Sequence, residues 1–346
     1  MGFWDYIAKR VGLASFVVVG TLVFTFFLSH ILPANPAVLF AGQNPTPQEI
    51  AEIDKQYGFN QPLPLALWVY LSNFFRGNLG TSIVAQQPVS ALIAQSLPNT
   101  LTLAALATIV AGTIGIPLGV LAAKSKGALI DHFLKIFSLS GVALPQFWLG
   151  LILQLIFAVR LHVLPIAAYG GSLFFTSHIT GSYLIDALIT GRFFVAGRIL
   201  WSLVLPVTTL SLYPLGVIIR QTRGAMMSVL SQDYIKAAKA YGIPEREIHY
   251  KYALKNALTP TIVSLGLVFA GSLIGVIYVE QIFFLEPGIG SLIVQALGVG
   301  ETSTSLASAP DYPLILGITL VAVVVYVASN LIVDLVQALI DRRIAL

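Results

Sequence analysis

The stretch SQDYIKAAKAYGIPEREIHYKYALKNALTP, residues 231–260, decides the fold. It is a charged segment in a chain that is 57% hydrophobic, and it lies between two long apolar runs. Because charged side chains are costly in hydrocarbon, we expect the segment to lie outside a bilayer. A compact, structured loop of this kind allows a soluble partner to bind a membrane protein and to transmit a conformational change to it.

The pattern of this segment predicts a helix, a glycine and a second helix. Ser231 is a suitable N-cap, and Asp233 places negative charge in the first turn, where the helix dipole favours it. Gly242 can end the first helix in a left-handed conformation. Pro244 is then expected at the first position of the second helix, followed by the acidic Glu245. The sequence therefore predicts two short helices joined by a tight reversal.

Hydropathy predicts an all-α membrane protein on either side of this segment. Charged residues make up only 10% of the chain, and its mean hydropathy is +0.86. About 20 apolar residues cross the hydrocarbon core as a helix, which satisfies its own backbone hydrogen bonds. Six runs are long enough, at 11–33, 99–123, 136–159, 199–219, 259–284 and 313–340. We therefore expect six transmembrane helices and a large external loop after the first.

The distribution of basic residues predicts the orientation. With the N-terminus inside, 14 of the 19 basic residues fall in cytoplasmic segments: Lys9, Arg10, Lys124, Lys126, Lys135, Arg220, Arg223, Lys236, Lys239, Arg246, Lys251, Lys255, Arg342 and Arg343. The external segments keep Lys55, Arg76, Arg160, Arg192 and Arg198. Cytoplasmic loops carry the excess of Lys and Arg, so both termini are expected in the cytoplasm. The net charge of +4 comes from these flanks and gives no reason to expect nucleic-acid binding.

Two external segments are too long to be simple connections. Within residues 34–98, Thr46 and Glu49 form a capping box at the start of a short amphipathic helix, and a second amphipathic stretch follows at about 64–77. These helices either rest on the outer leaflet or form a docking surface for an external partner. Residues 160–198 are expected to form a cap or a short interfacial helix, with Tyr169, Gly170 and Gly171 near its start.

The apolar run near the N-terminus is expected to be a retained helix. It is about 22 residues long, beyond the usual 7–15 of a cleaved signal peptide. We divide the chain into residues 1–98, which hold this helix and the external amphipathic segment, and 99–346, a five-helix core with the loop 231–260. The sequence has no cysteine, which excludes disulfides and thiolate metal sites. The histidines are scattered without the spacing of a metal site.

With these residues in view, the chain resembles the permeases of ABC importers, in the dipeptide, oligopeptide and nickel branch. The loop is similar to that family's cytoplasmic coupling motif at Asp233, Tyr234, Ala238, Ala240, Gly242 and Pro260. Elsewhere the similarity rests on RGNLGTS at 76–82, QPV at 87–89, LPNT at 97–100, Pro145 with Phe147 and Trp148, the turn with Glu280, Phe283, Pro287, Gly288 and Gly290, and DYP at 311–313. So many elements in one order extend the resemblance over nearly the whole chain.

The resemblance implies a subunit of a larger machine in the cytoplasmic membrane. Its partners would be a second homologous permease, two ATP-binding subunits and an external substrate-binding protein. ATP and magnesium would be bound by the ATP-binding subunits, and no cofactor is expected in this chain. Two positions depart from the family pattern, because Lys236 stands where the generic motif has glutamate and Pro244 where a Ser or Thr cap is frequent.

The physical requirements of coupling agree with this interpretation. A short helix must present one face to the ATPase while its other face is tied to the spanning helices. The small side chains of Ala237, Ala238 and Ala240 allow close approach, and Tyr234 offers an aromatic anchor. An ordinary lysine-rich solvated loop is the alternative, but such loops seldom combine an N-cap, a glycine stop and a proline in this order.

Polar residues inside the spans are candidates for the translocation pathway, since each is costly in hydrocarbon. Gln146 and Gln154 lie close to one face of the third span. Their side chains either form helix–helix hydrogen bonds or line the pore, and the sequence favours neither role. Asn330 and Asp334 share a face of the last span, and Asp334 is also explained by its proximity to the cytoplasmic end. Glu280, in the turn motif, completes the set of pathway candidates.

Three classes of function can be compared. A secondary transporter would be expected to have inverted repeats and mid-membrane ionisable groups, and an intramembrane enzyme would need a nucleophile with its base or a metal cluster. Neither pattern is visible, and no Walker-type phosphate loop is present. The favoured class is the permease of an ATP-driven importer. Di- and oligopeptides are the first expectation for its substrate, oligosaccharides the alternative, and nickel complexes a less favoured third.

Overall fold

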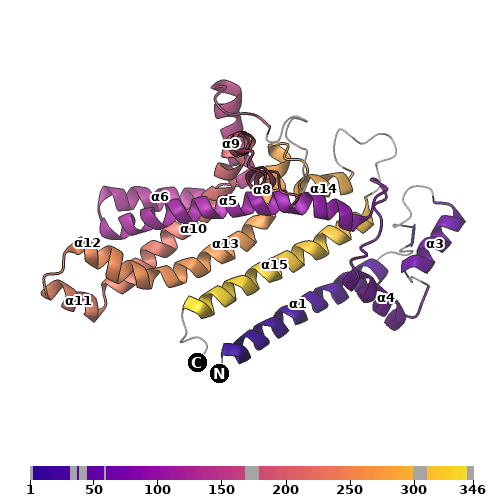
Figure 1. Ribbon diagram of the computed structural model, residues 1–346, viewed down its shortest axis with the longest axis horizontal. Coiled ribbons are helices and arrows are strands. Elements are labelled where there is room, and N and C mark those ends of the chain that lie inside the picture. The colour runs from indigo at the N-terminus through magenta and orange to yellow at the C-terminus, as the bar shows by residue number, and fades with distance from the viewer. Residues whose placement is uncertain are drawn as a thin grey trace.

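A computed structural model describes residues 3–31, 37–38, 45–57, 60–167, 179–298 and 310–340 of the chain. In these ranges the chain is helical, and the one β-bridge, between Thr81 and Pro88, is isolated. The helices are α1 (Phe3–Ile31), α3 (Pro47–Tyr57), α4 (Leu63–Phe75), α5 (Val89–Lys124), α6 (Leu129–Ala143), α7 (Gln146–Leu153), α8 (Tyr183–Ile189), α9 (Phe193–Ser202), α10 (Val204–Leu230), α11 (Asp233–Ala240), α12 (Glu245–Glu247), α13 (Leu254–Ile282), α14 (Ile289–Ala296) and α15 (Tyr312–Ile340), with π-helical turns η1 (Gln154–Arg160) and η2 (Ile248–Ala253) (Figure 1). The expected all-α class is confirmed.

Five helical stretches in the described residues are long and apolar enough to cross a membrane. They lie within α1, α5, α10, the continuous run Glu245–Ile282 and α15. A sixth span is formed if α6 and the α7–η1 helix are taken together, since they pass the same test as a pair. The prediction of six spans therefore holds with one of them broken.

The third span, expected at 136–159 with a break at Pro145, is broken there but has other bounds. It starts earlier, at Leu129, and its two halves meet at an angle of 105°. Pro145 causes this break, because its ring disfavours helical geometry in the preceding residue and it has no N–H to donate. Leu144 accordingly takes an extended conformation, with ψ 133°. The break directs α7 away from α6 and towards α13, where the Gln146 side chain lies against Gly275.

Glycines allow the central helices to approach closely. α10 lies at the centre, in contact with α5, α6 and α13. A Cβ at Gly119 of α5 would overlap Thr222 of α10, and one at Gly216 of α10 would overlap the backbone of Ser138 in α6. Small residues at helix interfaces are the usual device of membrane bundles, because they let backbones meet where no hydrophobic force drives association. These contacts join α5, α6 and α10 into one tightly packed unit.

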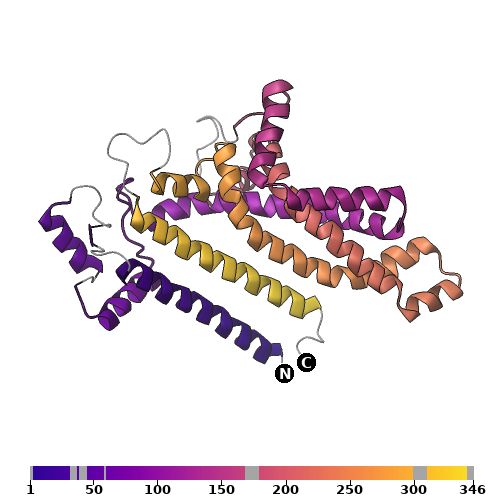
Figure 2. The same cartoon turned by 180° about the vertical axis from the view of Figure 1, so that it is seen from behind.

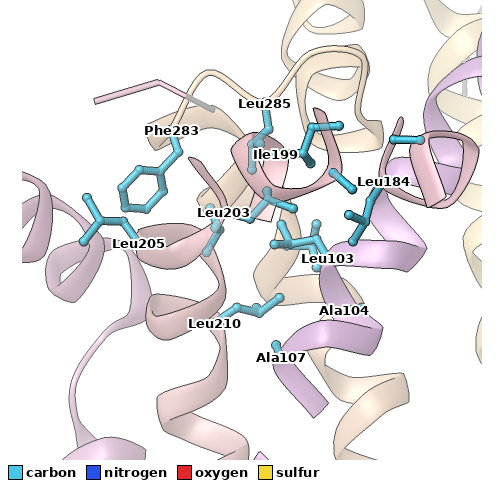
Figure 3. Packing of buried hydrophobic residues seen from close by; sticks show 14 of the residues in the cluster. Leu103, Ala104, Ala107, Leu184, Ile199, Leu203, Leu205, Leu210, Phe283 and Leu285 are labelled. Carbon is cyan, nitrogen blue, oxygen red and sulfur yellow. The ribbon is translucent and has the colours of Figure 1, made fainter. Parts of the chain in front are cut away.

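The largest apolar cluster in the described residues lies near the end of the bundle opposite α11. Leucine and alanine side chains from α5, including Leu103 and Ala107, meet Leu184 of α8, Ile199 of α9 and Phe283 after α13 (Figure 3). All five side chains are buried. The short helices α8 and α9, from the segment expected to form a cap, are thereby held on the bundle. The part of that segment with Tyr169, Gly170 and Gly171 lies outside the described residues.

The first and last helices lie side by side along one edge of the molecule (Figures 1 and 2). Arg10 of α1 forms an ion pair with Asp334 of α15, with 2.7 Å between Nη1 and Oδ2. Figure 1 shows α11 and α12 at one end of the bundle and α3 and α4 at the other, with the first residues of α1 and the last residues of α15 on the side nearer α11. The two predicted amphipathic helices of the first external segment are both present, as α3 and α4.

The capping box that opens α3 is present as predicted. The Thr46 N–H donates to Glu49 Oε2 over 2.8 Å, and the Glu49 N–H donates back to Thr46 Oγ1 over 3.3 Å. These hydrogen bonds to Thr46 hold the pKa of the Glu49 carboxyl below its ordinary value. The boundary expected between residues 98 and 99 lies inside α5 and stays a prediction.

Candidate functional site

The predicted coupling segment forms a short helix that ends at a glycine. α11 stops where Gly242 takes a φ of +76°, the left-handed conformation that glycine adopts without a steric penalty. The Gly242 N–H donates to the Lys239 carbonyl over 3.0 Å, and the Ile243 N–H donates to the Ala238 carbonyl over 3.2 Å. This pair of bonds is a Schellman motif, which satisfies the last carbonyls of the helix. The predicted left-handed conformation of Gly242 at the end of the helix is confirmed.

Two details of the predicted capping are wrong. Ser231 does not cap α11, because it ends α10 and its hydroxyl donates to the Ser228 carbonyl over 2.7 Å. Gln232 takes the N-cap position without a side-chain bond. Pro244 is the N-cap residue of α12, one position before the expected N1, and its carbonyl accepts the Ile248 N–H over 3.1 Å. The loop therefore has no side-chain N-cap, and packing must supply the rigidity.

One face of α11 is buried against the long helices. Ile235 is completely buried, Ala238 is 7% exposed, and both belong to an apolar cluster with Val120 of α5, Met226 of α10 and Ala257 of α13. A short helix isolated in water is unstable, so this burial is what holds α11 in place. α11 contacts η2, which in turn contacts α10 and α13, so the cluster links α11 to the spanning helices mainly through η2.

The opposite face of α11 is free in this chain. Tyr234, Ala237, Ala240 and Tyr241 are exposed, and Tyr241 exposes 86% of its surface. The Tyr234 hydroxyl accepts a hydrogen bond from the Asn256 Nδ2 of α13 over 2.8 Å, so its ring is positioned although solvent reaches it. Of these exposed residues, the two tyrosines are of a type enriched at the centre of protein–protein contacts, and the small alanines allow close approach of a partner.

A polar cavity of about 440 Å³ lies beside α12, and sequence reasoning missed it. It is lined by Lys124, Glu245, Arg246, His249 and Tyr250. The Lys124 ammonium lies 5.4 Å from the centre of the Tyr250 ring, a cation–π contact between the end of α5 and η2. The only sequence signal was a lysine closing an apolar run. The predicted coupling residue Glu245 lines the same cavity as Lys124 at the end of α5.

At the opposite end of the bundle, a buried polar cluster joins segments far apart in the sequence. Glu280 is 2% exposed, and one carboxylate oxygen accepts the Thr100 hydroxyl while the other accepts the Gly290 N–H, each over 2.6 Å. The Ile289 N–H in turn donates to the Thr100 hydroxyl over 3.0 Å. A Cβ at Gly288 would overlap the Glu280 carboxylate, which explains glycine there. The turn motif and the LPNT motif thus form one structure.

A second buried carboxylate joins two other motifs. Asp311, before α15, accepts the Ser82 hydroxyl over 2.6 Å and the Val84 N–H over 3.1 Å. Its other oxygen accepts the Leu314 N–H over 3.2 Å and so caps the first turn of α15. The RGNLGTS and DYP motifs are therefore tied together by one side chain. Their separation in sequence is why no local pattern predicts the pairing.

Comparison with known proteins decides the family. Residues 115–346 match the model of the family described as the binding-protein-dependent transport system inner membrane component, and residues 3–104 match the N-terminal model of such membrane components. The chain belongs to this family. It is therefore a multi-pass inner-membrane permease subunit of a binding-protein-dependent ABC system and is not itself catalytic.

Full-length relatives of the permease carry related names. It is 39% identical to the probable D,D-dipeptide transport system permease protein DdpB of Escherichia coli (strain K12), over 99% of this chain and 98% of the relative. It is 36% identical both to the di/tripeptide transport system permease protein DppB of Pseudomonas aeruginosa (strain UCBPP-PA14) and to the probable peptide ABC transporter permease protein y4tP of Sinorhizobium fredii (strain NBRC 101917 / NGR234), each over 98% of both chains.

The permease holds its pathway candidates in different surroundings. The Gln154 Nε2 donates to the carbonyls of Ile166 and Ile282 over 3.1 and 3.2 Å, and Gln146 lies against Gly275. Glu280 is engaged in the buried cluster described above. Asn330 lines a crevice between α1 and α15, and none of the other three candidates is in that lining. The four are therefore not brought together in this chain, and their place on the pathway stays a prediction.

Two further buried carboxylates in the permease hold elements in place. Asp131 of α6 is completely buried and accepts two hydrogen bonds from the Arg223 guanidinium of α10, over 2.7 and 3.0 Å. Asp186 accepts the Thr180 N–H and hydroxyl over 2.8 and 2.6 Å and the Ile179 N–H over 3.0 Å. Burial acts to raise the pKa of Asp186, but these hydrogen bonds outweigh it and hold the pKa below its ordinary value.

Proposed function

We propose that the chain is one of two transmembrane subunits of an ATP-driven importer of short peptides, and that it forms half of the translocation pathway. The observation that carries the proposal is α11, a helix whose Ile235 and Ala238 are buried in a cluster shared with α5, α10 and α13, while its other residues are exposed. A helix held in this way transmits motion between a soluble partner and the spanning helices.

The proposed complex contains a second, homologous permease, two ATP-binding subunits and an external binding protein. ATP and Mg²⁺ would be held by the ATP-binding subunits, whose surface would receive α11. The residues assigned to this contact are Asp233, Tyr234, Ala237, Ala238, Ala240, Gly242, Pro244 and Glu245. Among them, Ala238 faces inward and supports the helix, while Tyr234, Ala237 and Ala240 lie on the exposed side. The exposed group would therefore make the direct contact.

The orientation proposed for the chain places both termini and α11 in the cytoplasm. Lys and Arg are concentrated at the α11 end of the bundle, as the positive-inside rule requires. The segments 34–98 and 285–312 then face outward, where a binding protein would deliver the substrate. α3 and α4 lie at that end, either on the membrane surface or under the binding protein.

Short peptides are the substrate that the relatives favour. The related permeases with full-length similarity are named for D,D-dipeptide and di/tripeptide transport. Oligosaccharides remain the alternative and nickel complexes the less favoured third, because a binding protein rather than the permease sets most of the selectivity in such a system.

The test is uptake by the reconstituted complex. Proteoliposomes with this permease, its partner permease, the ATP-binding subunits and the binding protein should accumulate a labelled dipeptide only with ATP inside and binding protein outside. Omission of this permease should abolish uptake. Calorimetric titration of the binding protein with dipeptides, oligosaccharides and nickel chelates then decides the substrate, and tight binding of a sugar or a nickel complex alone would overturn the peptide assignment.

A further inference from the structure

A crevice between α1 and α15 has a charged mouth and apolar walls. Its volume is about 220 Å³. The polar residues in its lining are Arg10, Asn330, Asp334 and Tyr326, and the apolar ones are Leu13, Ala14, Val17, Val327 and Leu331. The two charged residues lie together at one end, whereas Asn330 and Tyr326 lie about one and two turns further along α15. Such a lining suits an amphiphile whose charged part lies at the Arg10–Asp334 end.

The polar end offers one cation and one anion in fixed positions. Arg10 and Asp334 form an ion pair at 2.7 Å, yet their side chains remain 40% and 22% exposed, so a ligand can reach both. The Arg10 guanidinium also lies 5.3 Å from the centre of the Tyr6 ring, which orients it. A guanidinium retains several donors beyond the one used by Asp334, in a geometry suited to phosphate.

Asn330 supplies the third polar group, and its side-chain oxygen is an unpaired acceptor. Its Oδ1 atom is buried and has no hydrogen-bond partner in the chain. Leaving such an oxygen unpaired costs about 1–3 kcal/mol, which a ligand with an N–H or O–H donor would relieve. The terminal torsion of asparagine is broad, so a small rotation turns this oxygen towards a donor in the crevice. A donor that reaches Asn330 from the crevice would relieve this cost.

The charged end of the crevice lies within reach of lipid headgroups. α1 and α15 have 29 residues each, about 43 Å of helix, whereas the hydrocarbon core is about 30 Å thick. Arg10 is seven residues after Phe3 and Asp334 is six before Ile340, which places both about 10 Å from the helix ends. On a centred helix the excess length is about 7 Å at each end, so the pair lies about 3 Å inside the hydrocarbon boundary, where a long side chain such as that of Arg10 reaches the headgroups. Below the pair, Asn330 and Tyr326 are the polar members of a mostly apolar lining.

We propose that this crevice binds a phospholipid whose headgroup joins a phosphate to a primary ammonium, as in phosphatidylethanolamine. Arg10 binds the phosphate, while Asp334 and Asn330 accept the N–H groups of the ammonium. Phosphatidylcholine has the same charges but no N–H donor, and phosphatidylglycerol has no ammonium. The occupied crevice becomes a four-group network of alternating charge, and the lipid then joins α1 to the rest of the permease.

The experiment measures lipid retention by the complete importer purified from membranes with its partner subunits. The complex is exchanged into nanodiscs that contain equal amounts of phosphatidylethanolamine, phosphatidylcholine and phosphatidylglycerol with identical acyl chains, and tightly retained lipid is measured by native mass spectrometry. We expect phosphatidylethanolamine to be retained over both others. Asn330→Leu should weaken this preference about three- to tenfold, the equivalent of one hydrogen bond.

Ser329→Ala is the matched control. The neighbouring Ser329 hydroxyl donates to the Val325 carbonyl of its own helix over 2.7 Å and is not part of the crevice lining, so the preference should not change. Equal retention of the three lipids by the unmodified complex, or preference for phosphatidylglycerol, overturns the proposal, as does an unchanged preference in Asn330→Leu. If Asn330→Leu fails to assemble, the comparison of lipids on the unmodified complex decides. No transport substrate is present, so the outcome is independent of the peptide assignment.

Discussion

Glu280 accepts two hydrogen bonds that hold the turn after α13 in place. Its carboxylate accepts from Thr100 on α5 and from the Gly290 N–H at the start of α14, and it is almost completely buried. A buried side chain with all its bonds made within the protein is more useful as an anchor than as a surface for a passing solute. The geometry thus favours a structural role for a residue that we predicted on the pathway.

Glu280→Gln separates the two roles. The amide keeps one acceptor oxygen but presents an NH₂ group to the other donor, so one buried bond is lost. We expect a loss of about 1–3 kcal/mol in stability, seen as a lower unfolding temperature of the purified complex and faster hydrogen exchange at residues 286–291. Thr108→Val is the control, since that hydroxyl bonds only to its own helix. Unchanged stability with altered substrate preference would instead support the pathway role.

Gly242 contributes backbone geometry alone to the end of α11. Nothing lies within 4 Å of a Cβ built there, so a side chain would meet no obstacle, but its φ of +76° is unfavourable for other residues. The difficulty of substitution is therefore strain and not crowding.

A pair of variants tests the turn. Gly242→Val should break the Schellman motif, because a β-branched residue tolerates this conformation least, whereas Gly242→Asn should preserve most of it. We expect the valine variant to insert normally but to lose substrate-stimulated ATP hydrolysis, and the asparagine variant to retain it. Lys239→Gln, on an exposed position, should change little. Normal coupling in Gly242→Val would contradict the role assigned to α11.

At the scale of elements, α6 is fastened to α10 by a buried ion pair at one end and by close glycine contacts along its length. Asp131 has two partners of different exposure. Arg223 is 20% exposed and makes two bonds, while Lys135 is 44% exposed and lies 2.9 Å away. The contribution of each partner of a buried carboxylate to stability depends on how much solvent screens the ion pair.

The two partners give a matched comparison. Arg223→Gln should destabilise the complex by on the order of 3 kcal/mol, because it leaves a buried carboxylate without its bidentate partner. Lys135→Gln should cost less than about 1 kcal/mol, as expected of an exposed pair. Thermal unfolding of the purified complex measures both. Equal effects of the two substitutions would show that the pair does not hold α6.

At the scale of the whole molecule, the α11 end and the opposite end of the bundle are separately organised. Apolar packing around Ile235 holds the first, and buried carboxylates at Glu280 and Asp311 hold the second. The orientation proposed for the chain places the first inside the cell and the second outside.

The absence of cysteine allows a direct test of this orientation. Gln232→Cys, before α11, should react with a membrane-impermeant maleimide only after the membrane is opened. Gln61→Cys, between α3 and α4, should react in intact cells. Both side chains are exposed, so accessibility and not burial decides the labelling. The reverse pattern would invert the proposed topology.

Local features were predictable from the sequence because their causes are local. The Thr46–Glu49 capping box and the Gly242 turn each depend on residues within a few positions. The partners of Glu280 and Asp311 were not predictable, since Thr100 and Ser82 lie far away in sequence and only packing brings them together. The position of the break at Pro145 was evident, whereas the 105° bend depends on the helices that α7 meets. The error at Ser231 arose because a good capping residue also suits the end of the preceding helix.

α5 extends from one end of the bundle towards the other and can transmit motion between them. Its 36 residues extend about 54 Å, so a tilt of about 10° around its midpoint displaces each end by about 5 Å. Pro117 lowers the bending stiffness of α5 near its Lys124 end, because proline has no N–H to donate to the Thr113 carbonyl. Pro98 interrupts the hydrogen bonds of the same helix near Thr100, so bending stiffness is reduced near both ends of α5, and Pro117 is the break nearer Val120. Pro117→Ala should make α5 stiffer and lower the number of peptides taken up per ATP hydrolysed. An unchanged ratio of uptake to hydrolysis would mean that α5 moves without bending.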